Sequence, residues 1–170
     1  YGLGFDVHSL TADPQFMDPD GADNILGSSS ALIGPARIVD DGDAGFSVSG
    51  DWTTGSVGYG EDVRREVVQA TGNRAEWRFE GLEPGTYAVY ATWPTGTSQG
   101  DVIYSVWEDN AMIGRSQINQ SVAPSGLTAD GATWQGLATV EITGDALAVR
   151  VTGGFMYVRM AADAVRVQRI

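Results

Sequence analysis

The sequence of 170 residues contains no cysteine and no lysine, and it has one histidine, His8. The absence of cysteine excludes disulfide bonds and thiolate metal sites. A lone histidine excludes any site that needs two imidazoles, and no Gly-x-Ser-x-Gly turn is present to suggest a serine hydrolase. No run of about 18 apolar residues exists, so we expect no helix that spans a membrane.

Basic residues are also scarce, because ten arginines stand against 22 acidic residues and give a net charge of −12. A surface of this charge repels nucleic acid and anionic membranes, and it suits neutral ligands and divalent cations. We therefore expect no nucleic-acid partner and no membrane insertion. Glycoside hydrolysis requires two acids that face one bond, but the acidic residues here cluster in predicted turns, where solvent leaves their properties ordinary. We predict that the protein is not an enzyme.

Residues 1–35 differ from the remainder by their density of Asp, Pro and Gly, with Ser28, Ser29 and Ser30 near the end. This composition predicts an irregular tail followed by a linker. Within it, GFDVHSL (4–10) and DPQFMDPDGADN (13–24) resemble the tail that closes many secreted right-handed parallel β-helix proteins. Since the sequence opens at Tyr1 without a methionine or a signal peptide, we expect a fragment or a processed product of a longer protein.

Residues 36–170 read as short strands between turns, and the clearest of them flank a turn within residues 77–93. Trp77, Phe79, Tyr87 and Val89 alternate with smaller or polar residues, which is the period of a strand with one buried face. The Glu-Pro-Gly turn at 83–85 reverses the chain, so we expect a hairpin at the centre of an antiparallel sheet. With no convincing helix elsewhere, the pattern predicts an all-β domain, an antiparallel two-sheet sandwich.

Residue groups across about 38–169 resemble, in order, those of the golvesin C-terminal-like family: DGDAGF (41–46), GDW (50–52), GYG (58–60), Trp77, LEPGTY (82–87), WP (93–94), NQ (119–120), WQGL (134–137) and ADAVR (162–166). The resemblance implies a jelly-roll of the galactose-binding-like type, found as an ancillary domain beside xanthan lyases, peptidases and other secreted bacterial enzymes. It also implies a non-catalytic, extracellular or cell-surface accessory module that binds polysaccharide or cell-envelope glycan for a larger protein.

Asp163 is the unusual residue of the last predicted strand, because it lies between Ala162 and Ala164 in an otherwise apolar run. A buried carboxylate is costly unless it is paired or bound to a cation. One hypothesis is that the Asp163 carboxylate accepts backbone N–H groups of the Gly42 loop or pairs with Arg37 or Arg166. The other is that it binds a metal ion.

The family resemblance favours a structural Ca²⁺ ion, because galactose-binding-like sandwiches bring the start of the first strand beside the last strand and a calcium ion often ties them. Asp40, Asp41 and Asp43 at the first strand and Asp163 at the last are the implied ligands.

Sugar binding would use an aromatic ring laid against the apolar face of a sugar, with polar groups taking its hydroxyls. The candidate rings are Trp107, Tyr59, Trp52 and Trp134. Trp107 precedes a turn and Tyr59 lies between glycines, which favours exposure of both. Trp52 and Trp134 belong to the family pattern, and for every one of the four a core position remains the alternative.

A structural role is the second hypothesis: a cap, spacer or fibre module that makes protein–protein contacts. The tail of residues 1–35 favours it, since its apolar residues would normally be covered by a β-helix. We expect strand 146–151 and the final strand to lie at sheet edges, where they would offer such contacts to the parent polypeptide or to neighbouring subunits.

Overall fold

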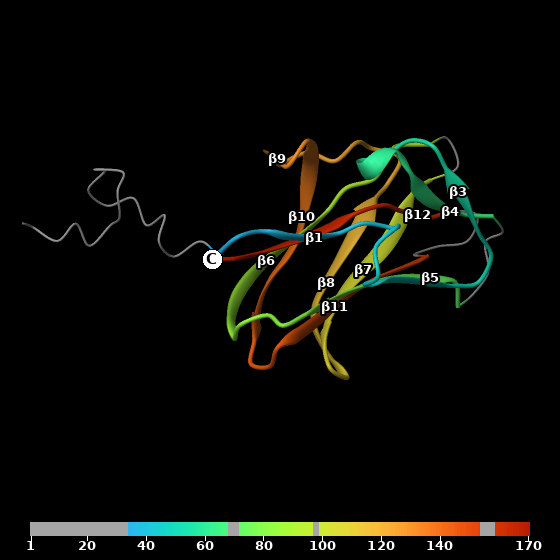
Figure 1. Ribbon diagram of the computed structural model, residues 1–170. Helices are drawn as coiled ribbons and strands as arrows, with labels where there is room; N and C mark the ends of the chain where they lie inside the picture. Colours follow the sequence, from blue (N-terminus) through green and yellow to red (C-terminus); the bar gives the residue numbers. More distant parts are fainter. Residues whose placement is uncertain (1–33, 68–71, 97–98, 154–158) are drawn as a thin grey trace, which may run out of the picture. The chain divides into compact units, whose positions relative to one another are not determined.

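The computed structural model describes residues 34–67, 72–96, 99–153 and 159–170. The predicted tail of residues 1–35 lies outside the described residues except for its last two, and it stays a prediction. Residues 34–170 form one compact unit whose regular structure, apart from a single 3₁₀ turn, η2 (Tyr59–Glu61), is β-strand in the described part. Along the chain of Figure 1 the strands are β1 (Arg37–Val39), β2 (Phe46–Ser49), β3 (Trp52–Gly55), β4 (Val63–Glu66), β5 (Arg74–Glu80), β6 (Gly85–Ala91), β7 (Asp101–Glu108), β8 (Ala111–Asn119), β9 (Leu127–Ala129), β10 (Ala132–Ile142), β11 (Ala146–Gly153), β12 (Ala161–Ala162) and β13 (Val165–Arg169).

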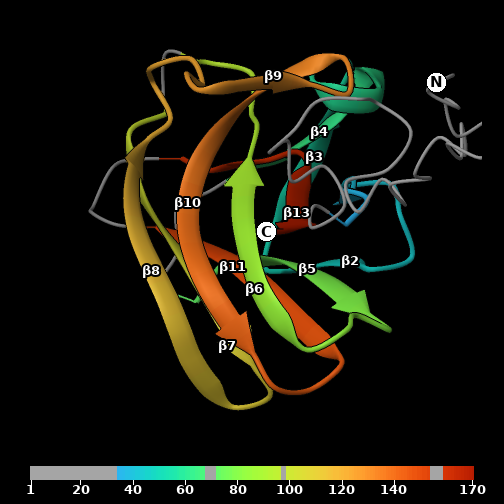
Figure 2. The same cartoon turned by 90° about the vertical axis from the view of Figure 1, so that its left-hand side faces the viewer.

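Two larger sheets face one another, with strand orders β1-β13-β6-β10-β9 and β2-β5-β11-β7-β8. In Figure 2, β10 and β6 of the first sheet lie in front of β7, β11 and β5 of the second. A third, small sheet of order β12-β4-β3 adjoins them, and all the strand pairs are antiparallel. The prediction of an all-β antiparallel sandwich is confirmed. No helix among the described residues is long and apolar enough to cross a membrane.

The predicted central hairpin is wrong in one respect, because β5 and β6 belong to different sheets. β5 pairs with β2 and β11, whereas β6 pairs with β10 and β13. The turn at 83–85 therefore carries the chain across the sandwich rather than along one sheet edge. Period-two alternation identifies the buried face of each strand, but it does not specify the strand's partner.

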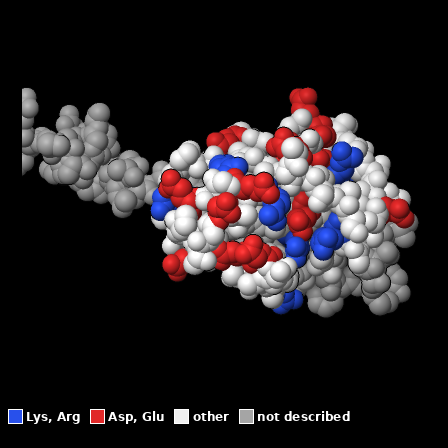
Figure 3. Space-filling model, turned by 60° about the horizontal axis from the view of Figure 1, so that its bottom comes forward, with Lys and Arg blue, Asp and Glu red and all other residues white. Residues whose placement is uncertain are grey.

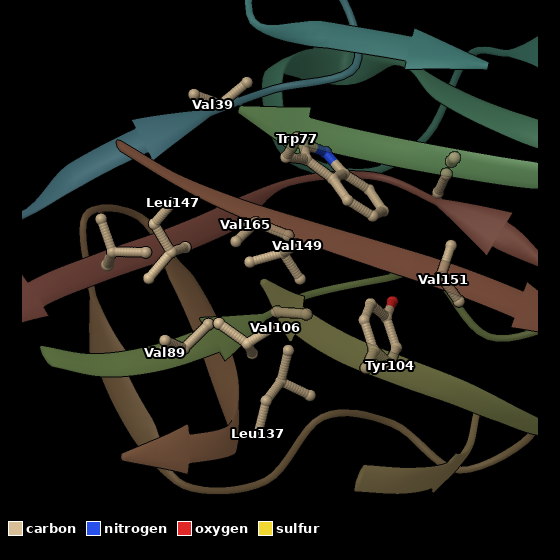
Figure 4. Packing of buried hydrophobic residues seen from close by; sticks show 14 of the residues in the cluster. Val39, Trp77, Val89, Tyr104, Val106, Leu137, Leu147, Val149, Val151 and Val165 are labelled. Carbon is tan, nitrogen blue, oxygen red and sulfur yellow. The ribbon is translucent and has the colours of Figure 1, made fainter. Parts of the chain in front are cut away.

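The core lies between the two sheets and is centred on Trp77, which is fully buried. In Figure 4 the Trp77 and Tyr104 rings lie near Val149 and Val151 of β11. Their ring centroids are 6.2 Å apart, and Phe46 packs on Trp77 at 5.4 Å. The Trp77 indole N–H also donates to the backbone oxygen of Asp163 at 2.8 Å. The core thus holds in place the segment that carries Asp163.

The edge strands differ from those expected. β11 lies between β5 and β7, and β13 lies between β1 and β6, so neither offers a free edge. β11 is mostly apolar, which is typical of central strands rather than edges, and the first three residues of β13 are buried. The predicted protein-contacting edges at 146–151 and at the final strand are therefore wrong.

The last strand is also interrupted. It was expected to run continuously across Asp163, but β12 ends at Ala162 and β13 begins at Val165. β12 pairs with β4 of the small sheet, and β13 pairs with β1 and β6 of the first sheet. Asp163 thus lies at the point where the chain passes from one sheet to another.

Candidate metal centre and adjoining hollow

Asp40, Asp41 and Asp163 meet at one end of the β1–β13 pair. Asp40 and Asp41 directly follow β1, Asp163 closely precedes β13, and the register pairs Val39 with Val165. One carboxylate oxygen from each acid lies within 4.8 Å of the others. The sheet therefore assembles three of the four acids that the family resemblance implied as ligands.

Asp43, the fourth, is used differently. Its Oδ2 accepts the backbone N–H of Asp40 at 2.9 Å, and its own N–H donates to the Asp40 carbonyl at 3.1 Å. Asp43 closes the turn that follows β1, and it is not one of the three clustered acids.

Asp163 is 1% exposed and has neither of the predicted arginine partners. Both of its carboxylate oxygens accept the backbone N–H of Tyr59, at 3.0 and 3.2 Å. Arg166 binds Asp130 instead, and Arg37 donates to the carbonyl of Glu80. Burial, with further contributions from the neighbouring acids, raises the pKa of Asp163 to about 8. A single N–H shared by two oxygens compensates little of the free energy that the burial of this carboxylate's charge costs.

Asp41 is 2% exposed, and neither of its carboxylate oxygens accepts a hydrogen bond from the described residues. Arg64 Nε lies 3.2 Å from Asp41 Oδ2, close enough for an ion pair, yet its N–H makes no hydrogen bond. Burial raises the pKa of Asp41 to about 6, and the charges of Asp62 and Asp40 add to the shift. Burial likewise raises the pKa of Asp40 to about 6. The cluster therefore holds more negative charge than the protein around it neutralises.

The 58–60 segment closes over these acids because two of its residues are glycines with positive φ. A Cβ atom at Gly58 (φ 129°) would lie 2.9 Å from both oxygens of Asp163, and one at Gly60 (φ 68°) would lie 2.2 Å from Asp40 Oδ2. Any side chain at either position would displace a carboxylate. The GYG sequence thus places the Tyr59 N–H on Asp163.

The sequence did not single out Asp62 or these glycines as parts of the site. The charge of Asp62 acts on all three clustered acids, although it precedes β4 and is distant in sequence from both Asp41 and Asp163. The only signal in the sequence was the pair of glycines around Tyr59, which predicted exposure rather than a tight approach.

The donor set fits a hard divalent cation. Ca²⁺ takes six to eight oxygen ligands at about 2.3–2.6 Å, so oxygens on opposite sides of one ion stand about 5 Å apart. The carboxylate oxygens within 4.8 Å of one another satisfy this limit, and the unpartnered Asp41 oxygens supply acceptors that lack donors. A bound cation would also offset the repulsion between the acids, which adds to the effect of burial on the three pKa values.

A hollow of about 390 Å³ adjoins the acids on the side of Tyr59, with Asp163 in its wall. Trp93, Pro94 and Asp130 border it as well. The partly exposed Tyr59 ring rests on the buried Trp134 ring, with centroids 5.4 Å apart. Tyr59 therefore contacts the acidic cluster through its backbone N–H and contributes its ring to the hollow.

The four predicted ligand rings do not meet at one site, although Tyr59 and Trp134 are in contact. Trp134 is fully buried and supports Tyr59. Trp52 is partly buried in β3, and its indole N–H donates to the Ser49 carbonyl. Trp107 is partly buried in β7, with the guanidinium of Arg150 lying 4.7 Å from its ring centroid. Of the four, only Tyr59 lines the hollow beside the acids.

The family profile of the Golvesin C-terminal domain matches residues 37–169. The chain belongs to the Golvesin C-terminal domain family. This golvesin domain accounts for nearly all of the described fold, and the match confirms the family resemblance read from the sequence. No curated protein matches the sequence.

Solved structures similar to the golvesin domain share its fold. A Paenibacillus xanthan lyase aligns with a TM-score of 0.66 and 23% identity over 79% of this chain and 13% of that chain. A family 35 carbohydrate binding module from Cellvibrio japonicus Abf62 aligns with a TM-score of 0.54 and 16% identity over 78% of this chain and 92% of the module. A family 35 module from Clostridium thermocellum aligns with a TM-score of 0.51 and 12% identity over 77% of this chain and 97% of the module. The golvesin domain thus spans a small part of the lyase and nearly the whole of each module, and the jelly-roll type of its sandwich is confirmed.

Proposed function

We propose that the golvesin domain is a non-catalytic accessory module that binds polysaccharide or cell-envelope glycan. The observation that carries this proposal is the position of Tyr59, whose ring faces a hollow while its backbone N–H binds the buried Asp163. An aromatic ring beside carboxylate acceptors is a common way to hold a sugar, since the ring covers C–H groups and the acceptors take hydroxyls.

In this proposal Asp40, Asp41 and Asp163 hold a structural Ca²⁺ ion. The ion links the end of β1 to the break between β12 and β13, and the residues 58–60 close against it. Bound Ca²⁺ supplies positive charge only. The protein's own residues fix the positions of the proposed ligands and of Tyr59. The Tyr59 N–H orients the Asp163 carboxylate, and the Trp134 ring packs against the Tyr59 ring.

Asp130 is the polar partner of Tyr59 in the hollow. Arg166, which is 5% exposed, donates to Asp130 Oδ2 at 2.8 Å and fixes the carboxylate at the rim. A sugar stacked on Tyr59 would present ring hydroxyls to the remaining lone pairs of Asp130. The acidic rim favours neutral sugars over anionic ones at this hollow.

The accessory role is supported by the size of the similar structures. Family 35 modules have nearly the length of the golvesin domain, whereas the xanthan lyase is a much longer chain that contains a similar domain. We infer that the golvesin domain belongs to a larger secreted bacterial protein and keeps that protein near its glycan. The tail of residues 1–35 is proposed as its connection to that parent polypeptide.

The proposal is tested by a binding screen against plant, algal and bacterial polysaccharides, with tryptophan fluorescence and affinity electrophoresis as readouts. Saturable binding of one polymer class supports the module, and the Tyr59→Ala variant should lose most of that binding. If a well-folded protein with Ca²⁺ present binds none of the panel, the glycan-binding proposal is overturned and the alternative of a structural, protein-contacting module takes its place.

A further inference from the structure

A second hollow, of about 320 Å³, lies beside β4. Arg65 of β4, Arg159 and Gln99 line it, and Gly96 forms part of its wall. The segment 92–96 borders both hollows, with Trp93 and Pro94 in the first and Gly96 in the second. One short segment therefore contributes to the walls of both hollows.

The two arginines of this hollow are unlike most others in the domain. Acidic and arginine side chains lie beside one another over the face seen in Figure 3. The arginines engaged in ion pairs are Arg64, Arg78, Arg150, Arg166 and Arg169. The side chains of Arg65 and Arg159 have neither an ion pair nor a hydrogen bond to any described residue. In a domain rich in acids, two arginines that line one hollow without an ion-pair partner suggest an anion from outside.

Arg65 is held in place by the sheet. It occupies the middle strand β4, where it pairs with Thr53 of β3 and Ala161 of β12. Its side chain runs past Gly55 to Gly96, because a Cβ atom would lie 3.3 Å from Nε at the first position and 3.2 Å from a terminal nitrogen at the second. Glycine at both positions leaves the path clear, and the guanidinium reaches the hollow from a rigid element.

Gln99 gives the second, independent observation. Both Nε2 and Oε1 of its side chain are buried, and neither has a hydrogen-bond partner among the described residues. A buried amide without hydrogen-bond partners lowers the stability of the folded protein, so such a group is usually satisfied by a ligand or a water molecule. Gln99 pairs by a backbone bridge with Arg159, so these two residues lie side by side in the wall of the hollow.

Glu66 also lines the hollow, but its carboxylate is already engaged. Asn73 Nδ2 donates to Glu66 Oε1 at 2.7 Å, and the backbone N–H of Met160 donates to Oε2 at 3.2 Å. One carboxylate against two guanidinium groups leaves an excess of positive charge. The hollow is therefore suited to a single negative group.

We infer that this hollow binds a carboxylate-bearing sugar, such as a uronate residue of an acidic polysaccharide. The carboxylate would pair with the Arg65 and Arg159 guanidinium groups, whose planar donors match its two oxygens. The Gln99 amide has one acceptor and two donors, and a neighbouring sugar hydroxyl satisfies both kinds. Sulfate offers no donor to Gln99 Oε1, so an inorganic anion leaves that atom unpaired. This inference rests on the proposed glycan-binding function and adds the class of sugar.

The test is a titration with sodium glucuronate, glucose and sodium sulfate, followed by NMR of the arginine Nε–H and glutamine side-chain amide groups. Glucuronate should shift the signals of Arg65, Arg159 and Gln99 and should bind at least tenfold more tightly than glucose. Sulfate should bind more weakly, because it cannot satisfy Gln99 Oε1. The Arg65→Gln and Arg159→Gln variants should each lose glucuronate affinity at least tenfold. Arg115→Gln, an exposed arginine of β8, is the matched control and should bind as the parent does.

If Arg65→Gln does not fold, Arg159→Gln carries the test, because Arg159 lies outside the named strands. Equal affinity for glucuronate and glucose, or glucuronate binding unchanged in Arg159→Gln, overturns the inference. Sulfate binding as tight as glucuronate indicates an adventitious ion only and also overturns it. In each of these cases polymer binding that depends on Tyr59 would leave the proposed function standing, whereas absence of all glycan binding would overturn both.

Discussion

The backbone N–H of Tyr59 donates to both carboxylate oxygens of Asp163, at 3.0 and 3.2 Å. This contact joins the acidic cluster to the hollow, since the Tyr59 ring lines that hollow and rests on Trp134. Any change that moves Asp163 therefore also moves Tyr59. The stability of the cluster and the binding of a glycan become coupled through one residue.

Removal of divalent cations is expected to lower the melting temperature. A ligand at a hundred times its dissociation constant stabilises a protein by about 2.7 kcal/mol, which corresponds to roughly 5–10 °C for a domain of this size. Calorimetry in Ca²⁺ and in chelator measures the difference. Asp163→Asn should abolish the Ca²⁺-dependent rise, whereas the exposed control Glu141→Gln should retain it. An identical melt in chelator and in Ca²⁺ would exclude the ion.

Gly58→Ala should weaken the site without replacing any of its proposed ligands. The new methyl group would lie 2.9 Å from both oxygens of Asp163, at a residue whose φ is 129°. We expect a loss of Ca²⁺ affinity of tenfold or more and a destabilisation of about 1–3 kcal/mol from the strained backbone. Gly131→Ala is the matched control, because Gly131 also has positive φ but no atom within 4 Å of a Cβ. Equal Ca²⁺ affinity in both variants would contradict the geometry.

Without divalent cations, stability should fall as the pH rises. Burial raises the pKa of Asp163 to about 8, well above the value near 3.8 of an unfolded aspartate. Between these values the folded state binds more protons than the unfolded state, so the free energy of unfolding decreases with pH until about pH 8. Asp40 and Asp41, with pKa values raised to about 6, act in the same direction.

In chelator the domain should therefore melt several degrees higher at pH 5 than at pH 8.5. With saturating Ca²⁺ the difference should shrink or reverse, because the cation binds the ionised carboxylates. Asp163→Asn should remove most of the pH dependence in chelator. A melting temperature that rises with pH in chelator would show that the three acids are ionised and compensated in the metal-free protein.

Tyr59 should contribute more to glycan binding than Trp107. Removal of a stacked ring is expected to cost about 1–3 kcal/mol, a five- to hundredfold loss of affinity, whereas Tyr59→Phe should keep the stacking. Trp107→Ala should change affinity little, since Arg150 already covers a face of that ring. Affinity electrophoresis with the polymer found in the screen compares all three variants. A larger loss in Trp107→Ala than in Tyr59→Ala would place the site on the outer face of β7.

Gln120 should be important for folding rather than for binding. It is fully buried, its amide donates to Tyr104 Oη and the Ala161 carbonyl, and its Oε1 accepts the Ala161 N–H. Gln120→Ala leaves these groups unpaired, and we expect a loss of about 2–4 kcal/mol in urea unfolding. The exposed Gln117→Ala should change stability by less than about 0.5 kcal/mol. A near-neutral Gln120→Ala would mean that water replaces the amide.

The sequence predicted the fold class well because alternation and turns are local signals. It placed Trp77 and Val89 on buried faces, and both are buried. The predicted pairing of strands was wrong, because β5 and β6 were expected in one sheet and lie in two. The turn at 83–85 is equally compatible with a hairpin and with a crossing from one sheet to the other.

The metal cluster was partly accessible from the sequence. Asp163 stood out as a charge in an apolar run, and the family resemblance paired it with Asp40 and Asp41. The part played by the Tyr59 N–H could not be predicted, because a backbone donor has no signature in the sequence. Gln99 gave no signal either, since a polar residue in a loop is usually solvated and its burial is visible only in three dimensions.

The pairing of β1 with β13 also has a mechanical consequence. Arg37 faces Val167, Ile38 faces Arg166 and Val39 faces Val165, after which come the acids Asp40 and Asp163. A pulling force applied to residues 34 and 170 would separate the two strands one residue pair at a time, beginning with Arg37 and Val167. An ion held by Asp40 and Asp163 would resist the last step of this separation, so calcium would set the force needed to part the two strands completely.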